Sequence, residues 1–307
     1  MRGTTMNQVP EIRGSSPEIS IIIPTYNRSV QLAMTLSSLV KQKGLPPQMI
    51  EILVVDDGSE DDTRALIQAA SARSQIGIHY ANQHHKGPAA ARNLGIQMAQ
   101  GQLILFIGDD IVANERLVAE HYFWHTSIFP RYNEAVLGYA PMVQSNGEPS
   151  LIQEWVNRKH TAYQNLEHMK EADYSYFYTC NISLKRDFLL NNGIFNAGFP
   201  FASSEDIELG MRLHEKGMKL YFNVKALGYH NHPLSVIQFI NRCYHNGRSS
   251  SIAQRLGIIR LDSYKGQRNK LSPFRDTKIS KKSIFLIYYL LSLICFLTGK
   301  IVESIKP

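Results

Sequence analysis

The sequence predicts an α/β protein with a mostly parallel central sheet, helices on both faces of that sheet and a helical tail at the C-terminus. Apolar strand-like runs alternate with helix-like segments through the first 110 residues, which is typical of a parallel sheet. Leu103–Ile107 is a continuous apolar run, as expected of a strand buried on both faces. Gly108, Asp109 and Asp110 follow it directly. Because ligands bind beyond the carboxyl ends of strands in open α/β sheets, we expect a functional site there.

The first part of the chain is predicted to contain right-handed strand–helix–strand units. Pro24 stops the first strand and Gly44 follows the first helix, so local breakers support these limits. The expected strands are Glu18–Ile23, Ile50–Val55, Ile76–Tyr80 and Leu103–Ile107, and the expected helices run from Ser29 to about Gln42, from Asp61 or Asp62 through Ala70, and from Pro88 to about Ala99.

The next part of the chain is expected to continue with helices and strands in less regular order. We predict helices at Leu117–His125 and at residues 151–171, the second one amphipathic, and strands at Ala135–Tyr139 and Leu220–Val224. Tyrosine and phenylalanine gather at residues 174–178. Their spacing favours core packing, although sugars also stack on aromatic faces.

The composition favours anionic partners, because the formal charge is +7 and the pI is near 9.2. No basic run interleaved with aromatic residues indicates nucleic-acid binding, so phosphorylated substrates or an anionic membrane surface explain the charge more simply. Three widely spaced cysteines without a CxxC pair indicate a reducing compartment. Residues 1–17 are polar and lack an apolar signal-peptide core, so we expect a disordered leader and a cytoplasmic protein.

The C-terminal part changes character after residue 263. Residues 264–282 are polar and basic, and Ile284–Leu297 then gives fourteen residues without a charge. A spanning helix needs about 20 apolar residues, so this run is short by itself. Lys281 and Lys282 suit an anionic, cytoplasmic leaflet, which favours peripheral contact with the inner membrane face. A helix docked on the catalytic domain, or on a second subunit of a homo-oligomer, remains the alternative.

The loops after three strands carry polar side chains in place of a phosphate-binding glycine motif. Neither GxGxxG nor GxxxxGK[ST] is present where such motifs would bind nucleotides. Asp57 can accept the imide N–H of uracil or thymine, and Tyr26 can pack on the base. Asp109 and Asp110 repel each other, which a divalent cation would relieve. The plainer alternatives are a turn at Asp57 and a strand end with a helix cap at Asp109 and Asp110.

Four segments in this order resemble the family 2 glycosyltransferases, which have the GT-A fold: Ser20–Arg28 (SIIIPTYNR), Val54–Ser59 (VVDDGS), Ala91–Gly95 (ARNLG) and Phe106–Ile111 (FIGDDI). The resemblance implies a nucleotide-sugar donor carrying UDP, dTDP or GDP, a divalent Mg²⁺ or Mn²⁺ ion, and inversion at the anomeric carbon.

The resemblance also implies roles for residues in the first half of the chain. Asp57 would meet the nucleobase, Asp109 would contact the ribose or donor, and Asp110 would bind the metal. The base pocket would be lined by Pro24, Thr25 and Tyr26, and Arg92 would be a further donor contact. Gly108 stands where many members have a third acid, which leaves weaker metal binding open.

A second group of matching residues lies after residue 178. The segment Thr179–Arg186 resembles the family's Asn-x-Ser segment, and Ser203–Gly210 matches its Glu-Asp motif at the start of a helix. The resemblance makes Asp206 the base that accepts the proton of the acceptor hydroxyl. Glu205 would orient the acceptor, although the helix dipole alone also favours acids there.

Two further residues are assigned less directly. His230 falls at the family's histidine position, where some members use it as a metal or diphosphate contact, and a structural role is the alternative. Arg248 lies in a segment that resembles a helix and loop folding over the donor, so a phosphate contact is expected.

The predicted function is metal-dependent, inverting transfer of a sugar to a hydroxyl of a glycan or lipid-linked acceptor. The expected organisation is a leader at 1–17, a GT-A domain at 18–250 with a nucleotide-binding half (18–111) and an acceptor half (112–250), and a basic linker with an apolar helix at 251–307. A sugar-nucleotide pyrophosphorylase is disfavoured because the loop after the first strand is not glycine-rich and basic. A binding protein without turnover is the other alternative, and only Gly108 suggests it. The sequence leaves the sugar, the base and the acceptor open.

Overall fold

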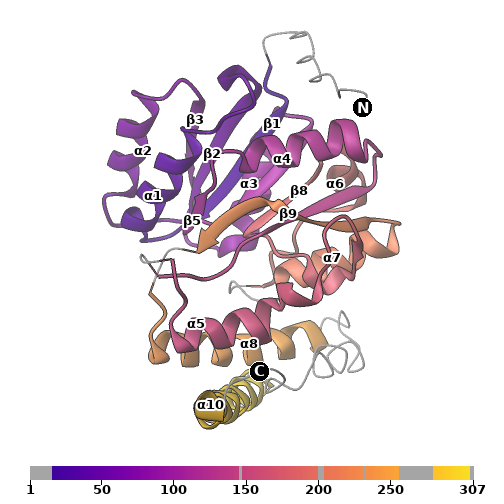
Figure 1. Cartoon of the computed structure of the whole chain (residues 1–307). Helices are drawn as coiled ribbons and strands as arrows, with labels where there is room; N and C mark the ends of the chain where they lie inside the picture. The colour runs from indigo at the N-terminus through magenta and orange to yellow at the C-terminus, as the bar shows by residue number, and fades with distance from the viewer. Residues whose placement is uncertain (1–15, 145–146, 200–203, 231–232, 256–278, 305–307) are drawn as a thin grey trace.

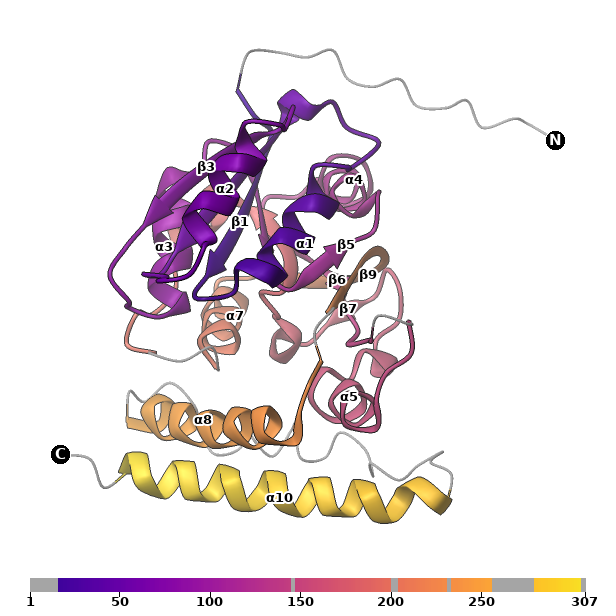
Figure 2. The same ribbon diagram turned by 90° about the vertical axis from the view of Figure 1, so that its left-hand side faces the viewer.

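The computed structural model describes residues 16–144, 147–199, 204–230, 233–255 and 279–304. Most of the predicted leader and the basic segment up to residue 278 therefore lie outside the described residues. Figures 1 and 2 show a twisted sheet flanked by helices, with α8 (Val236–Arg255) beneath this α/β body and α10 (Ile279–Ser304) beneath α8. The predicted C-terminal helix is thus a separate outer layer of the molecule.

The nucleotide-binding half forms the predicted parallel strands. β1 lies between β2 and β4, and β3 continues the sheet beyond β2. Right-handed crossovers place α1 and α2 on one face and α3 on the other. The elements are β1 (Ile19–Thr25), α1 (Ser29–Leu39), β2 (Ile50–Asp56), α2 (Thr63–Ser71), β3 (Gly77–Asn82), α3 (Pro88–Met98) and β4 (Leu103–Ile107), with a 3₁₀ turn at Pro47–Met49.

The sheet becomes mixed in the acceptor half. β8 (Asn181–Lys185) pairs antiparallel with β4 and with β6 (Glu134–Tyr139), and β6 pairs parallel with β9 (Lys219–His230). The short strands β5 (Ile111–Ala113) and β7 (Glu171–Ala172) each pair antiparallel with β9. The other helices before α8 are α4 (Leu117–Phe123), extended by a π-helical turn at Trp124–Ile128, α5 (Leu151–Val156), α6 (Arg186–Asn192) and α7 (Glu205–Glu215).

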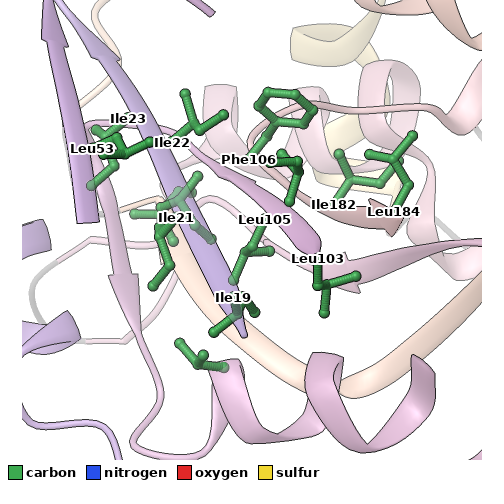
Figure 3. Packing of buried hydrophobic residues seen from close by; sticks show 14 of the residues in the cluster. Ile19, Ile21, Ile22, Ile23, Leu53, Leu103, Leu105, Phe106, Ile182 and Leu184 are labelled. Atoms are coloured by element: carbon green, nitrogen blue, oxygen red, sulfur yellow. The ribbon is translucent and has the colours of Figure 1, made fainter. Parts of the chain in front are cut away.

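The core sits on the two faces of this sheet. The five residues of β4 have exposed fractions of 3% or less, as the uninterrupted apolar run predicted. Figure 3 shows Ile21 of β1, Leu105 and Phe106 of β4, and Ile182 of β8 within one packed cluster. Burying this cluster supplies most of the hydrophobic driving force that holds the strand ends of the two halves together.

The predicted amphipathic helix at residues 151–171 is wrong in its length. The α-helical part ends at Val156, and a π-helical turn at Asn157–Thr161 leads to Ala162, which has a left-handed conformation with φ +48°. The chain turns there because Tyr163 is buried in the core, where its ring stacks on Phe222 at 5.9 Å between centroids. The helical periodicity was correct only for its first turns.

A buried polar network connects α4 to β8. His121 contacts Ser183 through Nδ1 at 2.8 Å and Asn181 through Nε2 at 2.9 Å, and His125 contacts the same serine at 2.9 Å. Burial lowers the pKa of His121 to about 4, so this imidazole is neutral at pH 7. The Asn-x-Ser segment therefore anchors the acceptor half from inside the core.

The helices α8 and α10 pack closely along each other. A methyl group on Gly247 or on Gly299 would lie about 2 Å from a carbonyl oxygen of the opposite helix, so both positions require glycine for this approach. Glu303 of α10 pairs with Arg248 at 2.7 Å and with Arg255 at 3.0 Å on α8. The predicted domain boundary at residue 250 falls inside α8. One face of α10 packs against α8, as the alternative of a docked helix predicted.

Candidate active site

One cavity of about 440 Å³ gathers the residues of both halves. It lies at the carboxyl ends of β1, β2 and β4, where the strand pattern predicted a site. Ten of the eleven predicted site residues line it, together with Gly108: Pro24, Thr25, Tyr26, Asp57, Arg92, Asp109, Asp110, Glu205, Asp206 and His230. Residues separated by up to about 200 positions in the sequence thus share one space.

Asp57 is held at one end of the cavity by the loop between β3 and α3. Its carboxylate accepts hydrogen bonds from the backbone N–H groups of Lys86 at 2.9 Å and Gly87 at 2.8 Å, and Nδ1 of His85 lies 2.8 Å from it. Tyr26 stacks on the His85 ring with centroids 4.1 Å apart. A flat ring system beside a fixed carboxylate can recognise a nucleobase by stacking and hydrogen bonding.

Asp109 and Asp110 share a cation from the β1–α1 loop. Arg28 places Nη1 2.9 Å from Asp109 and Nη2 3.0 Å from Asp110. The hydroxyl of Thr25 donates to Asp109 at 2.9 Å. The guanidinium therefore offsets the repulsion that the sequence predicts between the two acids.

His230 reaches Asp110 from the end of β9, with 3.3 Å between Nδ1 and Oδ1. Burial by itself lowers the pKa of His230, but the neighbouring Asp110 carboxylate outweighs burial and raises it to about 10. With this raised pKa, His230 is protonated at neutral pH, so the pair is an imidazolium–carboxylate contact. Ligation of a metal by this imidazole would require loss of its proton.

The side chains around Asp110 suit a divalent ion that is bound jointly with a phosphorylated substrate. A hard carboxylate oxygen and an imidazole nitrogen are ligands for Mn²⁺, and Mg²⁺ is commonly held by one or two carboxylates plus substrate phosphates. The described residues contain no group of three or more His, Cys, Asp or Glu placed to hold an ion without such help. Arg28 shows that the carboxylates already attract a cation.

Glu205 and Asp206 begin α7 and also line the cavity. Ser204 before them has a left-handed backbone, φ +71°, a strained conformation that is frequent at functional sites. Arg92 of α3 pairs with Glu205, with 2.9 Å between Nη1 and Oε1. Among the described residues, Oε2 of Glu205 is buried without a hydrogen-bond partner, so it can accept a hydrogen bond from a substrate.

Asp206 differs from its neighbour in forming no ion pair among the described residues, whereas Glu205 pairs with Arg92. Burial and the adjacent Glu205 raise the pKa of Asp206 to about 7, and Arg92 opposes this rise. A carboxylate with a pKa near neutrality is suited to accept a proton from a hydroxyl and release it again. Glu205, paired with Arg92, is better placed to orient a substrate.

Several lining residues were missed by the sequence interpretation. His160 and Thr161 reach the cavity because the helix at residue 151 ends early, and Thr179 and Cys180 lie just before β8. Tyr178 and Arg242 complete the wall on the side of Asp206. Arg28 and His85 could have been predicted from the sequence, because both lie in loops after strand ends, near predicted site residues. The position of Arg242 depends on how α8 packs.

Arg248 is not brought to the cavity. Its guanidinium pairs with Glu303 at the contact between α8 and α10. The predicted phosphate contact therefore lacks support from the structure, and on the same helix Arg242 faces the cavity instead.

Residues 20–131 match the sequence pattern of the family described as glycosyl transferase family 2. The validoxylamine A glucosyltransferase of Streptomyces hygroscopicus subsp. limoneus is 30% identical over 244 residues, which are 72% of this chain and 53% of that enzyme. A shorter match of 95 residues, 31% of this chain and 30% of the relative, is 35% identical to the GalNAc(5)-diNAcBac-PP-undecaprenol beta-1,3-glucosyltransferase of Campylobacter jejuni. The chain thus spans about half or less of the length of these relatives.

The fold resembles that of solved glycosyltransferases. The mannosyltransferase PcManGT of Pyrobaculum calidifontis, in complex with GDP-Man and Mn²⁺, superimposes with a TM-score of 0.62 at 14% identity. The alignment covers 94% of this chain and 87% of that protein. The predicted GT-A type of fold is confirmed by this likeness.

Proposed function

This chain carries a family 2 glycosyltransferase domain, and we propose that it transfers a sugar, with inversion, from a nucleotide-sugar to a hydroxyl of a glycan or lipid-linked acceptor. The observation that carries this proposal is that one cavity holds two groups of carboxylates. Asp57, Asp109 and Asp110 follow strand ends and form what we call the donor side, and Asp206, with its raised pKa, begins α7 and belongs to what we call the acceptor side. A donor and an acceptor can therefore meet between them.

The donor side is built to hold a nucleoside diphosphate. Asp57 would accept an N–H of the base, and Tyr26 and His85 would pack beside the ring. Asp109 would contact the ribose, and Asp110 with His230 would hold the metal ion. When bound, that Mg²⁺ or Mn²⁺ would neutralise the negative charge of the diphosphate leaving group. Mn²⁺ accompanies GDP-Man in the similar mannosyltransferase PcManGT, which supports a divalent ion here.

The acceptor side supplies the base. Asp206 takes the proton of the acceptor hydroxyl while its oxygen attacks the anomeric carbon from the face opposite the diphosphate. A carbon–oxygen bond to the acceptor forms, the bond to the diphosphate oxygen breaks, and the configuration inverts. Glu205, fixed by Arg92, would accept a hydrogen bond from the acceptor and orient it.

Two alternatives are weaker. A pyrophosphorylase needs a basic, glycine-rich loop after the first strand, and the loop at Thr25–Arg28 instead directs its one cation onto Asp109 and Asp110. A binding protein without turnover would not need a carboxylate with the raised pKa of Asp206 beside the donor site.

The proposed function is tested by screening UDP-, dTDP- and GDP-sugars with Mn²⁺, first by thermal shift and then by release of nucleotide. One donor should stabilise the chain and be hydrolysed slowly without acceptor, and transfer should raise the rate. Stabilisation without any turnover would favour the binding protein. Release of nucleoside triphosphate in the presence of pyrophosphate would favour the pyrophosphorylase.

We further propose that the enzyme works at the surface of a membrane through α10. Within the described residues, Ile284–Ser304 is long and apolar enough to span a bilayer, with a mean hydropathy of 2.0. A spanning α10 would pull the paired Arg248, Arg255 and Glu303 into the hydrocarbon, which is costly. If α10 lies on the membrane surface, these charged groups stay between α8 and α10, and the outer face of α10 meets the lipid.

Flotation with anionic liposomes tests this placement. The double variant Leu290→Glu/Ile294→Glu should lose binding, because both side chains are about half exposed on α10. A matched variant, Val30→Glu, changes an exposed apolar residue on α1 and should bind like the unaltered chain. Equal binding by the double variant would overturn the membrane placement.

A further inference from the structure

We propose, on the basis of the glycosyl transfer proposed above, that the acceptor carries a phosphate joined to a lipid chain, and that Arg242 of α8 binds this phosphate beside the acceptor hydroxyl. Arg242 lines the cavity and is exposed to it. No carboxylate among the described residues pairs with it, whereas Arg28 and Arg92 both contact acids. Among the three arginines of the cavity, it is the one available to an anionic group.

Arg242 belongs to the acceptor side of the cavity. Burial raises the pKa of Tyr178, the nearby Asp206 adds to the rise, and Arg242 opposes it, so the arginine and the proposed base both lie close to one tyrosine. Asp110 and His230, the residues proposed to hold the metal, line the same cavity. The closeness of Arg242 and Asp206 to one tyrosine assigns an anion at Arg242 to the acceptor, and competition with the nucleotide tests this assignment.

Residues near this arginine connect the cavity to α10. The hydroxyl of Tyr178 donates to the carbonyl of His160 at 3.1 Å. Burial lowers the pKa of His160 to about 3, with help from Arg242 and Lys159, so this neutral imidazole sits beside two cations. Nζ of Lys159 lies 5.8 Å above the ring of Tyr289 on α10. Cationic groups therefore extend from the acceptor side of the cavity to Tyr289, within the apolar run of α10.

The outer face of α10 suits a lipid chain. Six aliphatic residues on it have exposed fractions between 43% and 62%: Leu286, Ile287, Leu290, Ile294, Leu297 and Ile301. The described side chains on this face include no charge between Leu286 and Leu297. A molecule with a sugar hydroxyl and a phosphate would match Asp206 and Arg242, and its aliphatic chain would enter the lipid surface that the outer face of α10 meets.

The experiment uses the full chain and three probes: octyl phosphate, neutral octyl glucoside and inorganic phosphate. Calorimetry measures each affinity with and without the nucleoside diphosphate of the donor found by the screen. Octyl phosphate should bind more tightly than either other probe and should bind together with the nucleotide. Arg242→Gln should weaken octyl phosphate by roughly 10- to 100-fold, the range for a charged hydrogen bond, and leave octyl glucoside unchanged.

Two variants make the result specific. Lys216→Gln removes one exposed cation at the end of α7, away from the cavity lining, and should change no affinity. Arg242→Lys keeps the charge without the planar guanidinium and should retain part of the octyl phosphate affinity. Thermal melting of all three variants excludes loss of folding as the cause.

Three results would overturn the inference. If Arg242→Gln leaves the affinity for octyl phosphate unchanged, Arg242 does not bind the phosphate. If octyl phosphate and the nucleotide compete, and Arg242→Gln lowers the affinity for both, Arg242 binds the phosphate of the donor. Inorganic phosphate that binds as tightly as octyl phosphate would leave a free-anion site without a lipid. Donor turnover is measured separately, so its absence would count against the proposed glycosyl transfer and not against the phosphate contact.

Discussion

The two sides of the cavity differ in how their charges are matched. On the donor side, Asp57 accepts two backbone N–H groups and contacts His85, and Asp109 and Asp110 share Arg28. On the acceptor side, neither Asp206 nor Arg242 forms an ion pair among the described residues, although Arg92 lowers the pKa of Asp206. Both sides lie within one cavity of about 440 Å³.

This difference separates binding from proton transfer. A carboxylate with several partners is fixed in position, which suits recognition of a donor. A buried carboxylate beside another acid exchanges a proton near neutral pH, which suits a base. Changes on the acceptor side should therefore alter turnover, whereas changes on the donor side should alter affinity.

The largest expected effect follows from Asp206→Asn. The amide keeps the size of the side chain but cannot accept the hydroxyl proton, so the transfer rate should fall by roughly 10²- to 10⁴-fold. Donor affinity by calorimetry should change little. The matched control is Asp187→Asn, because Asp187 occupies the same second position of a helix, α6, and is exposed.

Turnover of Asp206→Asn within a few-fold of the unaltered enzyme would make Glu205 the candidate base. If Asp206→Asn lost donor affinity together with turnover, the Glu-Asp motif would belong to the donor side. Binding and proton transfer would then not be divided between the two sides.

Asp110→Asn should have the next largest effect, on affinity. A neutral amide replaces the proposed metal-binding carboxylate, so nucleotide affinity with Mn²⁺ should fall at least about tenfold, since loss of a mere outer-shell partner commonly costs 10- to 100-fold. Affinity measured with a chelator present is the internal control and should stay similar. Unchanged Mn²⁺-dependent affinity would remove Asp110 from the metal site.

The pH dependence of transfer should reveal Asp206. Since the base must be ionised and its pKa is about 7, the rate should rise with pH and level off above neutrality. At one pH unit below that pKa the rate should be about tenfold lower. Arg92→Gln removes a cation that lowers this pKa and should shift the rise to higher pH. A rate that is flat between pH 5 and 8 would contradict the assignment.

The smallest expected effect concerns Arg28. Its guanidinium occupies both carboxylates at which a metal ion would bind. Arg28→Ala should therefore increase the affinity for Mn²⁺ alone several-fold, as measured by calorimetry without nucleotide. Arg28→Lys separates position from charge, because the lysine keeps the charge but cannot bridge two carboxylates. Weaker Mn²⁺ binding in Arg28→Ala would mean that the arginine organises the site instead of competing for it.

The first half of the fold was largely predictable, and the second half was less so. In residues 18–111, each strand is a short apolar run and each helix has its own breaker, so local patterns suffice. Residues 151–171 carry a helical periodicity that tertiary packing overrides, because Tyr163 enters the core and Ala162 turns the chain. The three-residue strand β5 has no local signal, since its pairing with β9 fixes it.

Site residues show the same limit. Of the ten predicted site residues that line the cavity, nine came from motifs in which several side chains lie close together in the sequence. His230 and Arg248 were each assigned as single positions, and only His230 lines the cavity. On α8, Arg242 and Arg248 are equally basic in the sequence. Only the packing of α10, whose Glu303 pairs with Arg248, decides which of them faces the cavity.

The amino-acid sequence by itself determined the family, the parallel nucleotide-binding half and the acids at its strand ends, because local hydrophobic patterns and short motifs encode them. The tertiary structure alone decided which charges remain unmatched and which face of α10 stays exposed. Ion pairs such as Arg28–Asp110, Arg92–Glu205 and Arg248–Glu303 join residues 55 to 113 positions apart. Contacts at such separations depend on the packing of whole elements, which no local pattern specifies.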